Sequence, residues 1–165
     1  MKGKMKAQVF YEAEKMKLEE IPIPEVTPVD VLVKVKNVGI CGSDISYYYG
    51  LSPVGTPTGK GPIVLGHEFT GEVVEVGDVP KMLGLFSPGD RVVVNPVQNC
   101  NACTACAEGN THTCEKLYVP GVTNNGGFAE YCVSKYTGLF KLPAGVSYAA
   151  GAFTEPFACV INAVK

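Results

Sequence analysis

Short segments in which apolar and polar residues alternate recur along most of the chain. Residues 31–36 and 72–76 follow a period of two, which is typical of a strand with one buried face. Further short segments of this kind are bounded by turn-forming residues, and they comprise residues 6–11, 17–21, 63–65, 91–95, 128–133 and 138–142. The pattern predicts a mainly β domain, built as a small barrel or sandwich.

The C-terminal residues show a different period. Four apolar residues from Phe157 to Val164 are spaced as i, i+3, i+4 and i+7, which predicts an amphipathic helix. Pro156 disfavours a helical conformation at Glu155 but suits the first position of a helix, so we expect the helix to begin at Pro156. We therefore expect one domain over residues 1–150 and, over 151–165, the truncated start of a helix that connects to a further domain.

Composition and charge argue against several classes of protein. In the 165 residues, the hydrophobic share of 46% and the charged share of 18% are those of a globular domain. The net charge of −2 gives no electrostatic reason to expect nucleic acid or a membrane surface as partner. No apolar run approaches the ~20 residues that cross a bilayer, and Gln8 and Glu12 stand where a signal peptide would be apolar. We expect a cytoplasmic protein whose seven cysteines stay reduced.

Four of these cysteines, Cys100, Cys103, Cys106 and Cys114, are separated by two, two and seven residues. Short Cys-x-x-Cys steps bring thiolates to one point, and a fourth thiolate from across a small loop completes the tetrahedron of a structural Zn²⁺ site. Disulfides would need an oxidising compartment. A bacterial iron–sulfur run would place the fourth cysteine three residues on, with a proline after it, whereas Glu115 follows here. The spacing therefore favours a zinc-binding lobe over about residues 95–120.

A second candidate site lies on two glycine-flanked turns, each of which follows a predicted strand. Cys41 is on the first turn, and His67 and Glu68 are on the second. A thiolate, an imidazole and a carboxylate would hold Zn²⁺ with one open position, as catalytic sites do. A single histidine in such a place is also common as a core residue whose hydrogen bonds are satisfied. Because spacing alone does not show whether the two turns meet, the residues by themselves leave both interpretations open.

The remaining thiols and the second histidine carry no such signal. Cys132 and Cys159 fit no metal-binding pattern, and we expect both to be buried apolar thiols. His112 lies among polar residues inside the cysteine loop, and we expect it to be exposed.

Five motifs follow one another along the chain: Gly-Ile-Cys-Gly-Ser-Asp at 39–44, Gly-His-Glu-Phe-Thr-Gly at 66–71, Pro-Gly-Asp-Arg-Val at 88–92, the four-cysteine lobe, and Gly-Phe-Ala-Glu-Tyr at 127–131. Together they resemble the zinc-containing medium-chain alcohol dehydrogenases over nearly the whole chain. Cys-Gly-Ser-Asp and the segment Thr-Glu-Pro at 154–156 are most similar to the sorbitol (polyol) and threonine dehydrogenase branches. The N-terminal catalytic domain of that family is a GroES-like, partly open β-barrel, which agrees with the strand pattern.

Carried over residue by residue, the resemblance implies that Cys41 and His67 bind a catalytic zinc. Glu68 would be a ligand or a close neighbour of the metal, and Glu155 a further carboxylate that binds directly or through water. Side chains at successive positions of a strand point to opposite faces, so His67 and Glu68 can both be ligands only if the backbone turns at Gly66. We therefore expect Glu155 to be the third ligand when its helix is ordered.

The resemblance also gives a role to Ser43 and Tyr47. Ser43 matches a hydroxyl that passes the alcohol proton outward, and Tyr47 matches a tyrosine that lines the substrate pocket in the sorbitol branch. Ser43 and Asp44 could instead cap the turn after Cys41, and Tyr47 could belong to the core. Ser46 stands where sorbitol-type members carry a histidine, which argues against the outer part of a histidine proton relay.

The activity that the resemblance implies is the NAD(P)-linked oxidation of a secondary alcohol or polyol, with zinc acting as a Lewis acid. It further implies one catalytic and one structural Zn²⁺, a small-molecule alcohol or polyol as substrate, and a homo-oligomer in the complete protein. Members of the family carry a dinucleotide-binding half, but no Gly-x-Gly-x-x-Gly lies between a strand and a helix here. We therefore expect NAD(P) to bind only the complete protein and the chain as given to be inactive alone.

Other classes of function remain open. The chain could be a non-catalytic zinc-binding scaffold module, or half of a threonine-type amino-alcohol dehydrogenase. A co-chaperonin is suggested by the barrel alone, which is an analogy of fold. Metal content separates these classes, because the dehydrogenase half needs two zinc ions, a scaffold one and a co-chaperonin none.

Overall fold

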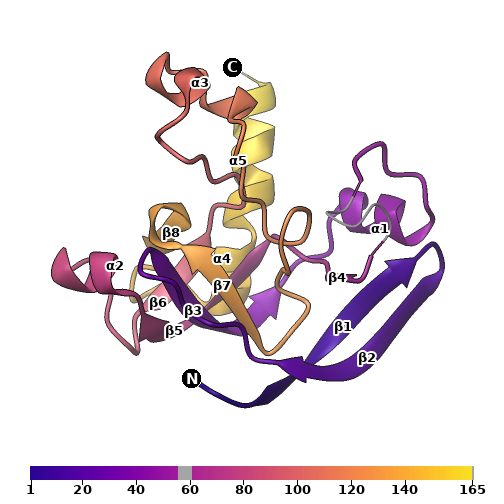
Figure 1. The fold of residues 1–165 in the computed structure, drawn as a ribbon, viewed down its shortest axis with the longest axis horizontal. Coiled ribbons are helices and arrows are strands. Elements are labelled where there is room, and N and C mark those ends of the chain that lie inside the picture. The colour runs from indigo at the N-terminus through magenta and orange to yellow at the C-terminus, as the bar shows by residue number, and fades with distance from the viewer. Residues whose placement is uncertain (56–60, 165) are drawn as a thin grey trace.

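The protein is described by a computed structural model that covers residues 1–55 and 61–164. Two antiparallel sheets form its framework (Figure 1). The smaller sheet has the order β2-β1-β4, with β1 at Lys4–Glu12, β2 at Lys15–Pro22 and β4 at Ile63–Val64. The larger sheet has the order β7-β3-β5-β6-β8, and its strands are β3 (Asp30–Val38), β5 (Phe69–Val76), β6 (Arg91–Val94), β7 (Tyr131–Lys135) and β8 (Leu139–Lys141). Within the described residues the sheets do not close into a full barrel, so the predicted mainly β, partly open architecture is confirmed.

One predicted strand, residues 128–133, is only partly right. Strand β7 begins at Tyr131, because the residues before it bond to the smaller sheet instead. The amide of Gly126 donates to Val64 O, the amide of Phe128 donates to Leu65 O, and Ala129 forms a bridge with Ala7. This segment therefore joins the two sheets before the chain enters β7.

Four short helices have no counterpart among the predicted elements, since a helix of four to seven residues is too short to show a 3.6-residue period. They are α1 (Gly42–Tyr48), α2 (Asp78–Met82), α3 (Thr104–Ala107) and α4 (Tyr148–Ala152), and two 3-10 turns, η1 (Thr111–Thr113) and η2 (Tyr136–Gly138), accompany them. The predicted C-terminal helix is α5 (Thr154–Ala163). The expected start of the last helix at Pro156 is wrong, because α5 begins at Thr154. Pro156 is the third residue of α5, where a backbone N–H would have no partner within the helix.

The main core lies against the larger sheet. It is made of the buried residues Val31, Val33, Phe69, Val73, Phe86, Val92, Val94, Cys132 and Leu139. Helix α4 packs on β3 and β5, and the Thr70 hydroxyl donates to Tyr148 O over 2.8 Å. Since β5 carries both Phe69 and Thr70, the strand that anchors the core also fixes the start of the C-terminal helices.

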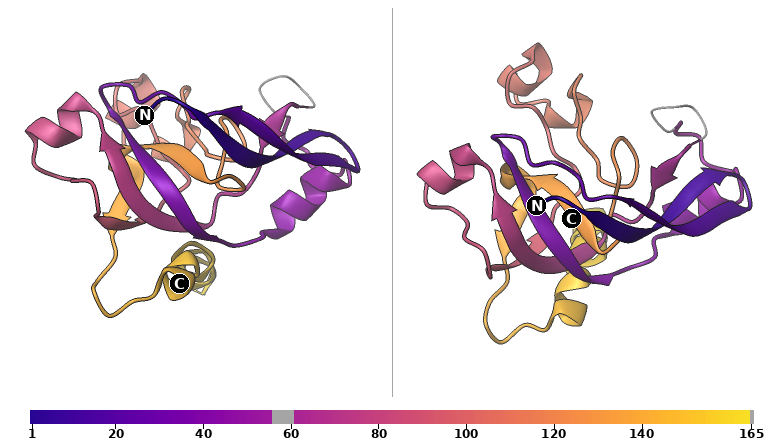
Figure 2. Two further views of the ribbon diagram at one scale, coloured as in Figure 1. Left: turned by 90° about the horizontal axis from the view of Figure 1, so that it is seen from below. Right: turned by 60° about the horizontal axis from the view of Figure 1, so that its bottom comes forward.

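Helix α5 and the cysteine lobe, which contains α3 and η1, project on opposite sides of the larger sheet (Figure 2). The apolar residues of α5 remain exposed, with 63% of Phe157 and 58% of Val160 accessible. No helix in the described ranges has both the length and the apolar character that crossing a membrane requires.

The segment that joins the sheets contacts the Gly66 turn very closely. A Cβ atom at Gly126 would overlap the carbonyl oxygen of Gly66 and the backbone of Gly121. We therefore expect Gly126→Ala to lower the free energy of unfolding by about 1–3 kcal/mol, as other overpacked sites do. Gly145→Ala is the matched control, because a Cβ there has no neighbour within 4 Å and should change stability little. Chemical denaturation of both variants measures the difference, and equal stabilities would contradict the proposed tight contact.

Candidate functional site

The register of β3 and β5 brings the two candidate turns together. Val38 at the end of β3 lies opposite Phe69 at the start of β5, and the Gly39 amide donates to Glu68 O over 2.8 Å. Residues that follow β3 therefore lie beside residues that precede β5. Cys41 comes just after β3, and Glu68 comes just before β5.

Cys41, His67 and Glu68 form one cluster, in which the possible ligand atoms all lie within 4.8 Å of one another. The His67 side chain is 12% exposed, and Glu68 is 7% exposed. The buried Nδ1 atom of His67 has no hydrogen-bond partner among the described residues. Buried polar atoms are rarely left unpaired, and a thiolate, an imidazole and a carboxylate are ligands that Zn²⁺ accepts. The two turns therefore meet, and the residues fit a zinc ion.

The backbone turn that lets neighbouring residues share this site is at Gly66. Its φ of 90° lies in the left-handed region that favours glycine. A Cβ atom at Gly66 would also overlap the Phe128 ring. Because β5 begins only at Phe69, His67 and Glu68 are free of the strand alternation that would separate their side chains.

Asp44 holds the two turns together and was not among the predicted site residues. Its carboxylate is 4% exposed and accepts hydrogen bonds from the amides of Cys41 over 2.9 Å and Gly66 over 3.2 Å. The bond to Cys41 forms part of a capping box at the start of α1. The Cys41-x-x-Asp44 spacing was the available signal for this cap, but nothing in the sequence indicates the bond to Gly66.

Ser43 and Ser46, on the same helix, have different environments. The Ser43 side chain is exposed, and its hydroxyl has no hydrogen bond within the part of the chain that the structure describes. The Ser46 hydroxyl donates to Gly42 O over 3.0 Å. The alternative role of a cap therefore belongs to Asp44, whereas the proton-transfer role of Ser43 stays a prediction.

Tyr47 packs in the core beside the site. It is 6% exposed, belongs to a cluster with Ile63 and Leu65, and makes an edge-on contact with Phe10 at 6.3 Å between ring centres. Its hydroxyl is buried and unpaired among the described residues. Tyr47 therefore packs as a core residue, and its role in substrate binding stays a prediction.

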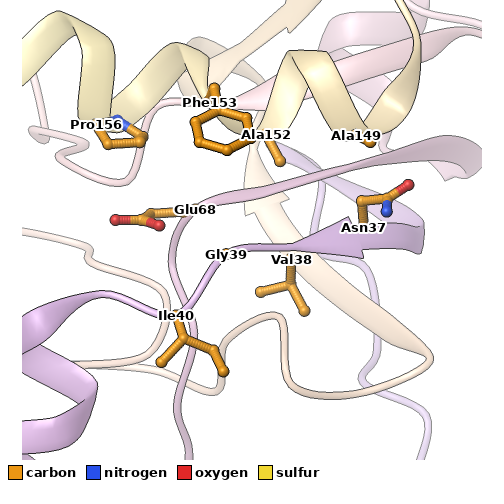
Figure 3. Close-up of a pocket in the computed structure, with 9 residues that line it drawn as sticks. All are labelled: Asn37, Val38, Gly39, Ile40, Glu68, Ala149, Ala152, Phe153 and Pro156. Atoms are coloured by element: carbon orange, nitrogen blue, oxygen red, sulfur yellow. The ribbon is translucent and has the colours of Figure 1, made fainter.

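A pocket of about 350 Å³ separates Glu68 from the C-terminal helices (Figure 3). Gly39 and Ile40 line one side, and Phe153 and Pro156 line the other. A Cβ atom at Gly39 would overlap the Glu68 carboxylate, so glycine leaves room for that carboxylate beside the backbone. The start of α5 therefore faces the metal cluster across this pocket.

Glu155 does not belong to the set of described residues that lie within 4.8 Å of one another, and Glu68 completes that set with Cys41 and His67. The Glu155 carboxylate accepts a hydrogen bond from the Cys159 thiol over 3.4 Å. Its predicted role as third ligand is untested. The expectation that Cys159 is buried is wrong, because α5 is exposed along this part of its length.

The four cysteines of the lobe are also brought together as predicted. The sulfur atoms of Cys103 and Cys106 are 3.5 Å apart, those of Cys100 and Cys106 are 3.9 Å apart, and Cys103 and Cys114 are 4.0 Å apart. These separations are too long for disulfide bonds, and all four thiols are free. Four thiols that converge in this way fit a closed, structural Zn²⁺ site.

Hydrogen bonds from backbone amides, burial and contacts between thiols give the lobe cysteines different pKa values. Hydrogen bonds from the amides of Ala102 and Cys103 lower the pKa of Cys100 to about 6. Although the Cys100 amide acts in the opposite direction, burial and contacts with the Cys100 and Cys106 thiols raise the pKa of Cys114 to about 11. Cys100 therefore ionises most readily, and the thiolate that it forms is the species that binds metal.

Cys132 and His112 lie outside both metal-ligand clusters. Burial alone raises the pKa of Cys132 to about 12, as expected for an inert core thiol. His112 is exposed as predicted.

If the lobe binds zinc, Cys103→Ser should release one metal ion per chain and leave the sheets folded, because the ligands belong to a local loop. Cys132→Ala is the matched control and should keep the full metal content. Elemental analysis with circular dichroism checks both variants. An unchanged zinc content in Cys103→Ser would rule out the lobe as a metal site.

Comparisons with known proteins agree with this geometry. Residues 27–144 match the model of the alcohol dehydrogenase GroES-like domain. The chain is 38% identical to sorbitol dehydrogenase of Bacillus subtilis (strain 168) over 162 residues, and the match covers 96% of this chain and 44% of that protein. It is 37% identical to D-altritol 5-dehydrogenase of Agrobacterium fabrum (strain C58 / ATCC 33970), with 98% of this chain and 46% of that protein covered.

Solved structures give the same result. A zinc-binding dehydrogenase from Sinorhizobium meliloti 1021, bound to NADP, has a TM-score of 0.85 and 35% identity, with 98% of this chain and 45% of that chain covered. For 2R,3R-butanediol dehydrogenase from Bacillus subtilis the TM-score is 0.82 and the sequence identity is 38%, and the match covers 97% of this chain and 46% of that chain. The chain thus spans less than half the length of these relatives. It belongs to the zinc-containing alcohol dehydrogenase family, in the sorbitol dehydrogenase-like branch, of which it contains the GroES-like domain.

Proposed function

We propose that this chain is the catalytic, zinc-binding half of an NAD(P)-linked dehydrogenase that oxidises a secondary alcohol or polyol. The observation that carries the proposal is the cluster of Cys41, His67 and Glu68 in a member of this family. The names of two relatives, sorbitol dehydrogenase and D-altritol 5-dehydrogenase, favour a polyol as substrate. The proposal includes two zinc ions, one at this cluster and one in the lobe.

The cluster is suited to activating a hydroxyl group. When bound there, zinc would supply Lewis-acid chemistry that makes an alcohol hydroxyl more acidic. Cys41, His67 and Glu68 would hold the ion, and three protein ligands leave one position open, as in catalytic zinc sites. Asp44 fixes the Cys41 and Gly66 turns from a buried position, which limits movement of the ligands.

Ser43 is the residue that we expect to move the proton. Its hydroxyl is exposed near the start of α1, and it can accept a proton from the substrate hydroxyl while donating its own to solvent. Ser46 is not equivalent, because its hydroxyl is bound to Gly42 O within the helix. The proposed path therefore runs from Ser43 directly to water.

In the complete protein, NAD(P) would bind a part that corresponds to the portion of the relatives outside the match with this chain. A relative solved with NADP shares the present fold over only 45% of its own length. NAD(P)⁺, the hydride acceptor, would then bind only the complete protein. A homo-oligomeric, cytoplasmic enzyme is part of the same proposal.

The proposal is tested by assaying the full-length protein on a panel of polyols, secondary alcohols and threonine, with NAD⁺ and NADP⁺. We expect Ser43→Ala to lower kcat by about 10²–10⁴-fold, the usual contribution of a proton-transfer group. Ser46→Ala is the matched control and should remain near the wild-type rate. Cys41→Ala should abolish turnover and remove one zinc ion. Turnover that survives in Cys41→Ala, or a full zinc content in that variant, would refute the proposed site.

A second prediction concerns residues 1–165 alone. Purified as such, they should bind two zinc ions but should not oxidise alcohols with NAD⁺ or NADP⁺, because they lack a dinucleotide-binding motif. Metal analysis and absorbance of the reduced nicotinamide check the two parts. Turnover by these residues that Cys41→Ala abolishes would show that the cofactor binds here after all.

A further inference from the structure

The motif Gly-Phe-Ala-Glu-Tyr at 127–131 begins in the segment that joins the two sheets, and its first residues lie against the turn that carries His67. The Gly127 amide donates to Gly66 O over 2.7 Å, and the Phe128 amide donates to Leu65 O over 3.0 Å. Two hydrogen bonds therefore attach the start of this motif to the two residues that precede His67.

The Phe128 ring packs against Gly66 itself. Three of its carbon atoms, Cγ, Cδ1 and Cε1, lie 2.7–3.0 Å from the point that a Cβ atom of residue 66 would occupy. The same ring packs on two apolar clusters, one with Phe10 and Leu65 and the other with Val64. The ring is therefore held by the core, and it fills the space where another residue would carry a side chain.

Gly66 is thus engaged on three sides. Its amide donates to the Asp44 carboxylate over 3.2 Å, and its carbonyl oxygen accepts the Gly127 amide. Its third side, where a Cβ would be, faces the Phe128 ring. Glycine has no Cβ that restricts its backbone, so a φ of 90° is one of several conformations open to it. The contacts around Gly66 must therefore fix the direction in which the chain continues to His67.

We propose that Phe128 is a positioning residue whose ring holds Gly66 in the conformation that directs the His67 imidazole to the metal cluster. This inference rests on the proposed function and deepens it, because it names a residue that prepares the cluster for zinc. Asp44 fixes the amide side of the same glycine, and Phe128 fixes the side without a Cβ. With a smaller side chain at position 128, the metal would have to order the turn on binding, which lowers affinity.

The experiment measures metal affinity at the two sites separately. The full-length protein is loaded with isotopically enriched cadmium(II) as the probe, and cadmium NMR follows its removal by the chelator nitrilotriacetate. Each thiolate ligand shifts the cadmium resonance, so the four-thiolate lobe and the one-thiolate cluster give separate signals, and the lobe is an internal control. We expect Phe128→Ala to weaken cadmium binding at the cluster about 10–100-fold, as loss of a group that orients metal ligands usually does. Affinity at the lobe should stay at the wild-type value.

Two further variants separate positioning from packing. Phe128→Leu keeps most of the apolar volume but loses the flat ring, and it should weaken cadmium binding at the cluster about three- to tenfold. Its cluster resonance should also broaden, because the imidazole is less firmly positioned. Phe10→Leu is the matched control, since Phe10 belongs to a cluster on which Phe128 packs but is not among the nearest neighbours of a Cβ at Gly66. This control should keep wild-type affinity at both sites.

Unchanged cluster affinity in Phe128→Ala would overturn the inference, and if that variant does not fold, Phe128→Leu decides in the same way. An equal loss in Phe10→Leu, or a parallel loss at the lobe, would also overturn it, since either outcome means that a general weakening of the core is responsible.

Failure of the proposed function is distinguished by the wild type. If the wild type binds cadmium at the cluster but oxidises no alcohol, the dehydrogenase proposal fails while the Phe128 variants still decide the positioning role. A wild type without the cluster resonance would refute the metal site, and the inference with it.

Discussion

The candidate metal site depends most directly on the two hydrogen bonds that the Asp44 carboxylate accepts. It accepts the amides of Cys41 and Gly66, and Oδ1 lies 3.9 Å from Nδ1 of His67. The two amides belong to turns that are 25 residues apart in the chain, so one buried side chain fixes their spacing. Leaving a buried donor unpaired costs about 1–3 kcal/mol, so the cost of losing either bond opposes separation of the two turns. The site is therefore held by a connection between loops as well as by the sheet.

The sheet brings those loops into reach before Asp44 joins them. Pairing of β3 with β5 sets Val38 opposite Phe69, and a change of register by one residue would turn Phe69 out of the core. The apolar burial that fixes the register thus also fixes where Cys41 and Glu68 emerge. Gly66 supplies the positive φ that lets His67 and Glu68 converge.

Sequence reasoning succeeded where a signal is local. The lobe cysteines lie within one short loop, so their spacing was sufficient to predict the convergence of their sulfur atoms. Strand alternation likewise located β3 and β5. The meeting of Cys41 with His67 could not be deduced from spacing, because it depends on a long-range strand register. The family resemblance supplied what the residues alone left open.

The sequence was least informative about α5, for a physical reason. Its apolar period correctly predicted a helix, but burial cannot be deduced from periodicity when the structure leaves that face uncovered, and the same uncertainty led to the wrong expectation for Cys159. The two metal sites differ in the same respect. The lobe draws every ligand from one loop and can close around its ion locally. The cluster combines residues from two distant turns, so its geometry depends on how those turns are held.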